Sequence, residues 1–362
     1  LAESEAVGIN LDDGFSESLI RNEGEIEVIA TAESIESDAY ADARGIFVYD
    51  FQDSEIINDA DVTVTASADS YDYSDVDAYG MYILTNSSGE DSASLITNNG
   101  TISANAEATI STEEEGSIYT QSTGIYVSHS YDADFTLNNT GTITATINDE
   151  LGKDGYSLYI NSNYAERVNV TNSGTLRGNI DVEGSLINNG ISSKIANIEL
   201  AHNAMGNDNA YIENFTNKEF GKLTIGLLTD GDMENTTYSQ LVTDTATFED
   251  GSTIGVNVLA ASTNVGLLAG NKLENVVSAT TALNIDGKLN ITDNSLLLDF
   301  DYETSEGWIN GEDGAIHLNI VQATNDNGEE ITIETATKDG GGNKNTQAAA
   351  KVLNNISNNL GS

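Results

Sequence analysis

Histidine is the side chain best suited to acid–base or metal chemistry near neutral pH, and this chain has three of them, His129, His202 and His317. None lies in an HExxH pattern, which would place two zinc ligands on one helical face, and no GxSxG motif supplies an activated serine. The absence of cysteine excludes disulfides, thiolate metal sites and cysteine catalysis. His317 alternates with apolar residues in an expected strand, so we expect it to be structural or exposed.

Carboxylates are the other residues that could do chemistry, since paired acids serve glycosidases and clustered acids bind Ca²⁺. Nothing marks a pair among the 59 acidic residues, so we expect no enzyme, with a polysaccharide-acting or other β-helix enzyme as the alternative. Candidates for a weak, loop-built Ca²⁺ site are Asp72, Asp75, Asp77, Glu113, Glu114 and Glu115. A solvated acidic face that gives solubility is the alternative, because no EF-hand loop or GGxGxDx repeat is present. We expect no other cofactor.

The charge balance narrows the possible partners. The chain carries 13 basic and 59 acidic residues, a net charge of −46. Such a surface repels nucleic acid phosphates and anionic lipid headgroups, so both are excluded as partners.

Two motifs recur together and define the elements that must position these residues. The first is a Gly followed by alternating apolar residues, as in VGINL, RGIFV, YGMYI and TGIYV. The second is an apolar residue, an Asn, usually a Gly, and a Thr/Ile/Val run. The second motif is centred on Asn22, Asn58, Asn98, Asn139, Asn172 and Asn188. Its spacings are unequal, so the unit tolerates insertions, and each unit is expected to form three short strands.

Stacking of these units would bury their apolar faces. In the first strand we expect Ile46 and Val48 to lie over Met81 and Ile83, and these over the matching residues of the next units. In the third strand the apolar pairs beginning at Ile26, Val62, Ile102 and Ile143 would stack in the same way. The sequence therefore predicts an all-β, parallel β-helix, in agreement with the absence of proline.

Two ladders of side chains follow from this stacking. The first is a ladder of Asn side chains that hydrogen-bond from coil to coil, with a binding role as the alternative: Asn22, Asn58, Asn98, Asn139 and Asn172. The second is an outward aromatic ladder: Phe47, Tyr82, Tyr126 and Tyr159. The aromatic ladder could stabilise the coils, or it could bind glycans or another copy of the chain. Acid-rich segments at 33–43, 69–78, 111–122 and 148–156 are expected to leave each coil as loops on one side.

The repeat weakens along the chain and gives four expected regions. Regular coils with acidic loops span 1–190, irregular coils 191–245, a C-terminal cap 246–323, and a polar, Gly-rich linker with a short helix-prone tail 324–362. No long apolar segment is present, and the first residues lack a signal-peptide pattern.

The chain resembles the passenger domain of bacterial autotransporters, the type V secretion family. The resemblance rests on the repeated NNGTI and NSGTL units, the GNIDVEGSLINNG stretch, the block from GSTIGVNV to AIHLNIVQA, and the NTQAAAKVLNNI tail. It implies a right-handed β-helix, an autochaperone-like cap and the start of a linker helix, with the outer-membrane β-barrel translocator as partner during export. It also implies a possible cleavage between Asn354 and Asn355.

The resemblance implies a function without catalysis. We expect an extracellular structural and adhesive module, exported through the outer membrane to the bacterial surface, that acts in attachment, self-association or biofilm. Its partners would be its own copies, surface glycans, and host or abiotic surfaces. A released passenger that polymerises into extracellular filaments is the alternative.

Overall fold

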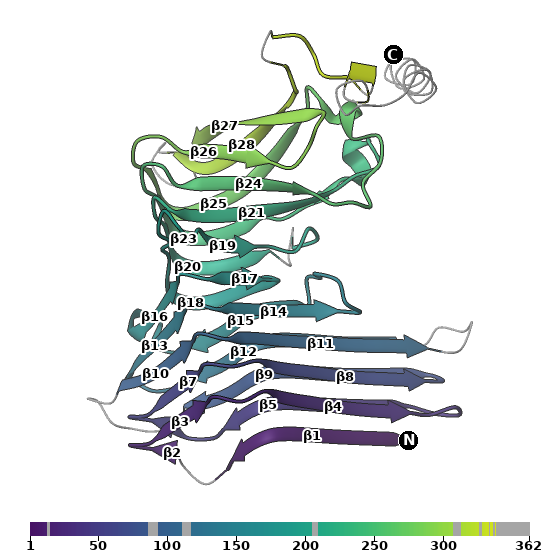
Figure 1. Ribbon diagram of the computed structural model, residues 1–362, viewed down its shortest axis with the longest axis vertical. Helices are drawn as coiled ribbons and strands as arrows, with labels where there is room; N and C mark the ends of the chain where they lie inside the picture. The colour runs from purple at the N-terminus through teal and green to yellow at the C-terminus, as the bar shows by residue number, and fades with distance from the viewer. Residues whose placement is uncertain are drawn as a thin grey trace.

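The computed structural model describes residues 1–12, 15–85, 93–110, 117–204, 209–306, 313–325, 328–332, 334, 335 and 337. The described chain is nearly all β-strand, stacked along one long axis with the N-terminus at one end (Figure 1). Among the described residues, no helix has the length and apolar character needed to cross a membrane.

Two large sheets and one small sheet make up the stack. The largest has 16 strands: β1 (Ala2–Leu11), β3 (Leu19–Asn22), β5 (Ala39–Val48), β7 (Glu55–Asn58), β9 (Tyr73–Thr85), β10 (Ala93–Asn98), β12 (Ser117–His129), β13 (Asp134–Asn139), β15 (Gly155–Ser162), β16 (Val168–Asn172), β18 (Asn179–Asn188), β20 (Ala210–Asn217), β23 (Leu241–Phe248), β25 (Lys272–Ile285), β27 (Leu298–Glu306) and β28 (Asp313–Gln322).

The second sheet has 10 strands, and a short pair, β2 (Phe15–Ser16) and β6 (Phe51–Gln52), lies apart. The 10 strands are β4 (Ile26–Glu33), β8 (Val62–Ser70), β11 (Thr101–Ile110), β14 (Thr142–Ile147), β17 (Thr175–Arg177), β19 (Ala196–Glu199), β21 (Gly221–Leu228), β22 (Thr237–Tyr238), β24 (Thr253–Val258) and β26 (Asn290–Asp293). Short 3₁₀ turns lie at Ala165–Arg167, Met233–Asn235 and Val265–Leu268.

The coils stack in the register that the apolar pattern predicts. We call each successive set of three strands a coil; β9, β10 and β11 form one. Ile46 pairs with Met81 and Met81 with Ile125, all fully buried. Ile102 likewise pairs with Val62 below and Ile143 above. The prediction of an all-β fold built on long parallel sheets is confirmed, and the arrangement is consistent with a β-solenoid.

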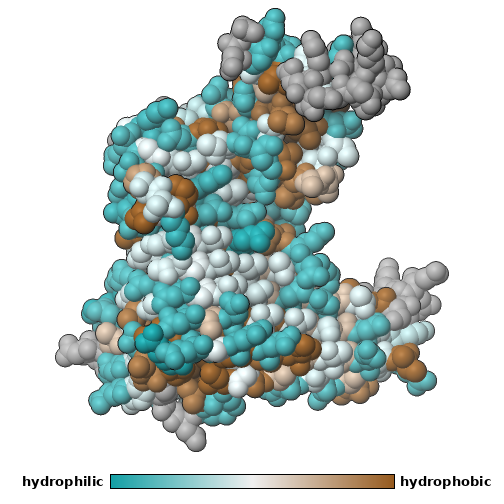
Figure 2. Space-filling model, in the orientation of Figure 1, coloured by the Kyte–Doolittle hydropathy of each residue, from teal (hydrophilic) through white to brown (hydrophobic). Residues whose placement is uncertain are grey.

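Two features of the stack change along its length. Through the first coils the 16-stranded sheet has two separate strand columns, which merge at β18 because β18 pairs with both β15 and β16. Towards the C-terminus the pairing becomes antiparallel, between β25 and β28 and between β28 and β27. In the view of Figure 2, hydrophobic residues gather at the end formed by the first coils and again towards the C-terminal end.

The acid-rich segments differ from the expectation that they form loops. Large parts of them are strand: 39–43 lies in β5, 73–78 in β9 and 117–122 in β12. The reason is packing, since Ala39, Ala41 and Ala43 point inward and are 0–3% exposed while the residues between them face outward. Asp42, Asp75 and Asp77 are therefore held on a regular sheet surface.

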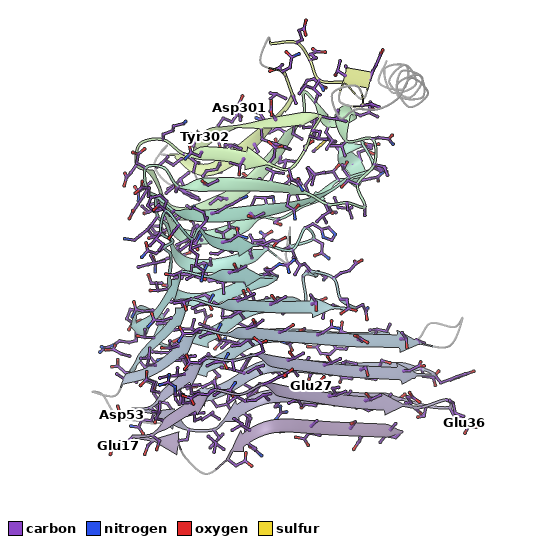
Figure 3. All side chains as sticks on the ribbon, in the orientation of Figure 1. Glu17, Glu27, Glu36, Asp53, Asp301 and Tyr302 are labelled. Carbon is purple, nitrogen blue, oxygen red and sulfur yellow. The ribbon has the colours of Figure 1, made fainter. Side chains whose placement is uncertain are left out.

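Acidic side chains also lie at both lateral edges of the stack. Glu36 lies at the tip of the turn between β4 and β5, whereas Glu17 and Asp53 lie at the opposite edge (Figure 3). Acidity is therefore not confined to one side of the molecule.

Candidate functional site

The outer face of the 16-stranded sheet carries a continuous ladder of aromatic rings. In register, Phe47 pairs with Tyr82, Tyr82 with Tyr126 and Tyr126 with Tyr159. Ring centroids are 5.7 Å apart for Phe47 and Tyr82, 4.6 Å for Tyr82 and Tyr126, and 5.4 Å for Tyr126 and Tyr159. The last two pairs are stacked nearly parallel, at 13° and 8°. Because the rings cover each other's faces, the ladder presents ring edges and hydroxyls outward.

A second row of tyrosines packs edge-on against the ladder. Tyr79 lies 4.9 Å from Tyr82 and Tyr156 lies 5.3 Å from Tyr159, both nearly perpendicular. Residues three apart on a strand normally face opposite sides. Tyr79 and Tyr82 share a face because the inward–outward alternation changes phase at Gly80.

Glycine is the only residue type that fits at position 80. A Cβ there would lie 2.3 Å from Ile102 Cγ2 and 2.5 Å from the carbonyl oxygen of Gly124. The close approach of neighbouring backbone and of the facing sheet therefore requires glycine. The same residue fixes the phase change that brings Tyr79 and Tyr82 together.

The two rows enclose a groove of about 490 Å³, which we call the aromatic groove. It is lined by Tyr79, Tyr82, Ile118, Tyr119, Thr120, Gln121, Tyr126, Asp154, Tyr156 and Tyr159. Ile118 and Tyr119 are each 52% exposed at the start of β12. The groove thus combines apolar ring edges with hydroxyl, amide and carboxylate groups on a rigid sheet.

A second groove of about 500 Å³, the acidic groove, lies next to it on the same face. It is lined by Glu3, Ser4, Glu5, Tyr40, Ala41, Asp42, Arg44, Asp75 and Asp77. The two grooves adjoin because Asp77 pairs in register with Gln121 and Asp75 with Tyr119.

Burial raises the carboxyl pKa values in the acidic groove. The pKa of Asp77 is raised to about 6, chiefly by burial and further by the charges of Asp75 and Asp42. Burial also raises the pKa of Asp42, against the opposing effect of its ion pair with Arg44. The pKa of Asp75 is raised by burial and partly offset by a hydrogen bond from Tyr73. Negative charge is therefore costly here unless a cation lies close.

The Ca²⁺ candidates are only partly brought together. Asp75 and Asp77 share the acidic groove, whereas Asp72 is exposed in the turn before β9. Glu113, Glu114 and Glu115, and the cleavage candidates Asn354 and Asn355, lie outside the described residues. Within the described part of the chain, no three His, Asp or Glu side chains converge as metal ligands.

The asparagines form a buried chain of side-chain hydrogen bonds. Asn22 Nδ2 donates to Asn58 Oδ1 at 2.7 Å, and Asn58 donates in the same way to Asn98 at 2.8 Å. The chain continues through Asn139 and Asn172 to two further members, Asn188 and Asn217. Every amide in it is 7% exposed or less, so these side chains join neighbouring coils and are not accessible to a ligand.

The histidines do not form a catalytic constellation. His129 is 2% exposed, its Nδ1 lies 3.4 Å from Thr85 Oγ1, and burial lowers its pKa. Burial also lowers the pKa of His202. His317 is held on both ring nitrogens, by the Asn275 backbone N–H at 3.0 Å and by Ser305 Oγ at 2.8 Å, as a structural histidine would be.

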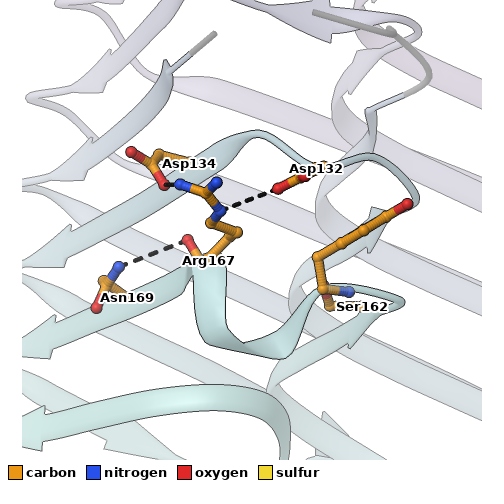
Figure 4. Close-up of polar contacts among 6 residues, drawn as sticks. Asp132, Asp134, Ser162, Arg167 and Asn169 are labelled. Atoms are coloured by element: carbon orange, nitrogen blue, oxygen red, sulfur yellow. Dashed lines mark hydrogen bonds and ion pairs between the residues drawn. The ribbon is translucent and has the colours of Figure 1, made fainter. Parts of the chain in front are cut away.

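Basic residues are scarce, and several connect successive coils. Arg167 donates to Asp132 at 3.0 Å and to Asp134 at 3.1 Å (Figure 4). Arg21 pairs with Asp59 at 2.7 Å and Arg177 with Glu199 at 2.9 Å. These pairs are largely exposed, so each contributes little to stability.

Sequence reasoning missed Tyr79, Tyr156, Tyr119 and Arg44. Tyr79 and Tyr156 each stand three residues before a ladder tyrosine, with Gly80 and Ser157 at the matching position between them, and this repeated spacing was the available signal. Tyr119 was assigned to a loop because of the acidic residues before it.

Comparison with protein-family models gave no match. Comparison with curated proteins likewise gave no match. The function is therefore argued from the geometry of the two grooves.

Proposed function

We propose that this chain is a non-catalytic binding module of a bacterial surface, of the autotransporter passenger type, which mediates attachment or self-association through the aromatic groove. The observation that carries the proposal is the aromatic groove itself. Ring edges, hydroxyls and amides on a rigid sheet suit polyhydroxylated glycans or a second copy of the same face.

The proposal includes the winding of the chain and its C-terminal part. Right-handed winding is favoured because parallel strands joined by crossovers in one sheet are almost always right-handed. The antiparallel pairing of β25, β28 and β27 suits a cap. The expected helix-prone tail lies beyond residue 337, outside the described residues.

Binding is favoured over catalysis by the composition of the groove. Its lining includes one carboxylate, Asp154, whereas glycoside hydrolysis generally uses two. The ladder rings are locked by stacking, which suits a preformed binding surface.

The test uses residues at the rim of the aromatic groove, so that the fold is kept. Beads coated with the chain are assayed for attachment to glycan-coated and abiotic surfaces and for clumping. The variant Ile118→Ser/Tyr119→Ser should lose most of the attachment or clumping, because both side chains are exposed beside the ladder. The matched control is Ile35→Ser/Tyr49→Ser, which changes exposed residues outside the groove lining and should behave as wild type. Equal binding by all three proteins would contradict the proposal.

The enzyme alternative is tested with a panel of polysaccharide and protein substrates. Reproducible turnover that a single carboxylate substitution abolishes would replace the binding proposal with a catalytic one.

A further inference from the structure

The outer face of β5 already holds one guanidinium between a carboxylate and aromatic rings. The Arg44 guanidinium donates to Asp42. Its central carbon lies 5.3 Å from the ring centroid of Phe47 and 5.2 Å from that of Tyr82. A charge-assisted hydrogen bond and cation–π contacts thus hold the same cation.

The next coil repeats this arrangement without the cation. In register, Asp77 pairs with Asp42 and Tyr79 takes the place of Arg44. The Tyr79 hydroxyl donates to Gln121 Oε1 at 3.3 Å instead of to the carboxylate. Among the described residues, none forms an ion pair with Asp77. Asp77 therefore has neighbouring rings and no ion-pair partner, because Arg44 of the preceding coil pairs with Asp42 instead.

Unpaired polar atoms collect in the acidic groove. Asp77 Oδ1, Asp42 Oδ1 and Arg44 Nε are buried, and no hydrogen-bond partner lies among the described residues. All three residues line the acidic groove of about 500 Å³. Buried polar groups are nearly always paired. A hydrogen-bond donor that enters the groove would therefore pair with the free oxygens of Asp77 and Asp42 at once.

We propose that the acidic groove binds an arginine side chain of a basic, extended peptide segment, with the guanidinium against Asp77 beside Tyr40 and Tyr119. The inference goes beyond the proposed function of the aromatic groove, because it assigns a separate ligand to the acidic groove beside it. Charge complementarity supports this occupant, because Glu3 and Glu5 add to the negative potential along the groove. Arginine fits better than lysine, since its planar guanidinium can donate hydrogen bonds to carboxylates on two neighbouring strands at once.

A metal ion is the poorer occupant. Ca²⁺ takes six to eight oxygen ligands at about 2.3–2.6 Å. Here Asp42 and Asp77 face each other on strands about 4.8 Å apart, and among the described residues no third His, Asp or Glu converges with them as a metal ligand. A second copy is also a poor source of the cation, because the chain carries a net charge of −46.

The experiment measures binding of an end-blocked peptide of alternating arginine and glycine to the full chain in about 0.15 M NaCl, by fluorescence anisotropy. The control peptide has citrulline in place of arginine, which keeps the shape and removes the charge. We expect the arginine peptide to bind at least about tenfold more tightly than the citrulline peptide, in line with the strength of charge-assisted hydrogen bonds. Equal binding of the two peptides would overturn the inference.

Two variants locate the site. Asp77→Asn keeps the side-chain shape and should weaken arginine-peptide binding about tenfold. Glu36→Gln removes the same charge from the exposed tip between β4 and β5 and should leave binding within about twofold, because isolated surface charges contribute little. An equal loss in both variants would show attraction by net charge alone and would overturn the site.

A competition experiment tests Ca²⁺ as the alternative occupant of the acidic groove. Displacement of the peptide by millimolar CaCl₂, but not by NaCl of equal ionic strength, would overturn the assignment in favour of Ca²⁺. Failure of this inference can be distinguished from failure of the proposed function. If the peptide does not bind but the rim variant of the aromatic groove still loses attachment, the assignment of the acidic groove is wrong and the proposed function stands.

Discussion

At the scale of single residues, the buried asparagine chain gives the sharpest stability prediction. Asn98 is fully buried, accepts from Asn58 and donates to Asn139, each at 2.8 Å. Asn98→Ala should lower the free energy of unfolding by roughly 2–4 kcal/mol, because it leaves partners on both sides unsatisfied in the interior.

The matched control for this change is its neighbour in the chain. Asn99 is exposed and bonded to Asp59 at 2.8 Å, so Asn99→Ala should cost less than about 1 kcal/mol. Denaturant unfolding of both variants, followed by circular dichroism, makes the comparison. Similar losses would show that the ladder bonds do not carry the stability assigned to them.

A second residue-scale prediction concerns pH. The pKa of Asp181 is raised to about 6, mainly by burial and further by the charge of Glu183. Its folded pKa therefore lies above the ordinary value of 3.8. The protonated form stabilises the fold below about pH 4, and that contribution is lost as the pH rises to about 6.

Asp181→Asn should remove this pH dependence. The stability of the variant relative to wild type should increase between about pH 4 and pH 6 and stay constant above that range. Denaturant midpoints measured for both proteins from pH 4 to pH 8 give the difference directly. A difference that does not change with pH would contradict the assignment.

At the scale of elements, the glycine at the phase change of β9 controls both stability and the aromatic groove. Gly80→Ala should destabilise the fold by roughly 1–3 kcal/mol, because the added Cβ collides with the Gly124 carbonyl and with Ile102. It should also weaken binding in the aromatic groove, since Tyr79 loses its position beside Tyr82. Thermal unfolding and the attachment assay measure the two effects.

Gly24→Ala is the control for this substitution. No heavy atom lies within 4 Å of a Cβ at Gly24, so this change should be neutral or slightly stabilising. If Gly80→Ala is equally neutral, the phase change does not depend on glycine.

The inward-facing half of each coil could be predicted from sequence. Apolar columns such as Ile46, Met81 and Ile125 have one consistent register, and a shift by one residue would turn them outward. The outward half could not be predicted as well. The small inward alanines of β5 did not distinguish a strand from an acidic loop, and neither did the acidic residues before β12.

The two grooves could not be predicted from local sequence patterns alone. Tyr79 and Tyr82 lie together because the inward–outward alternation of β9 changes phase between them. A regular two-residue alternation along the sequence does not predict this change. The contact of Arg44 with Tyr82 joins two coils. Such positions are set by stacking and by the space left around a glycine.

At the scale of the whole molecule, net charge should govern self-association. A charge of −46 makes copies repel one another. The Debye length falls from about 30 Å at 0.01 M salt to about 8 Å at 0.15 M, which screens exposed charges on opposing molecules. We therefore predict that the chain is monomeric at low ionic strength and associates as NaCl is raised.

The route of association can be read from the same experiment. The antiparallel pairing of β27 and β28 gives the C-terminal part a different edge from the parallel strands of the first coils. Side-by-side contact through the aromatic groove is thus favoured over end-to-end stacking. Light scattering at 0.01 M and 0.15 M NaCl should show salt-dependent association that is reduced in Ile118→Ser/Tyr119→Ser and kept in Ile35→Ser/Tyr49→Ser. Association that persists in the rim variant would instead place the contact at the ends of the stack, and monomers at both salt concentrations would leave attachment to a foreign ligand as the function of this surface.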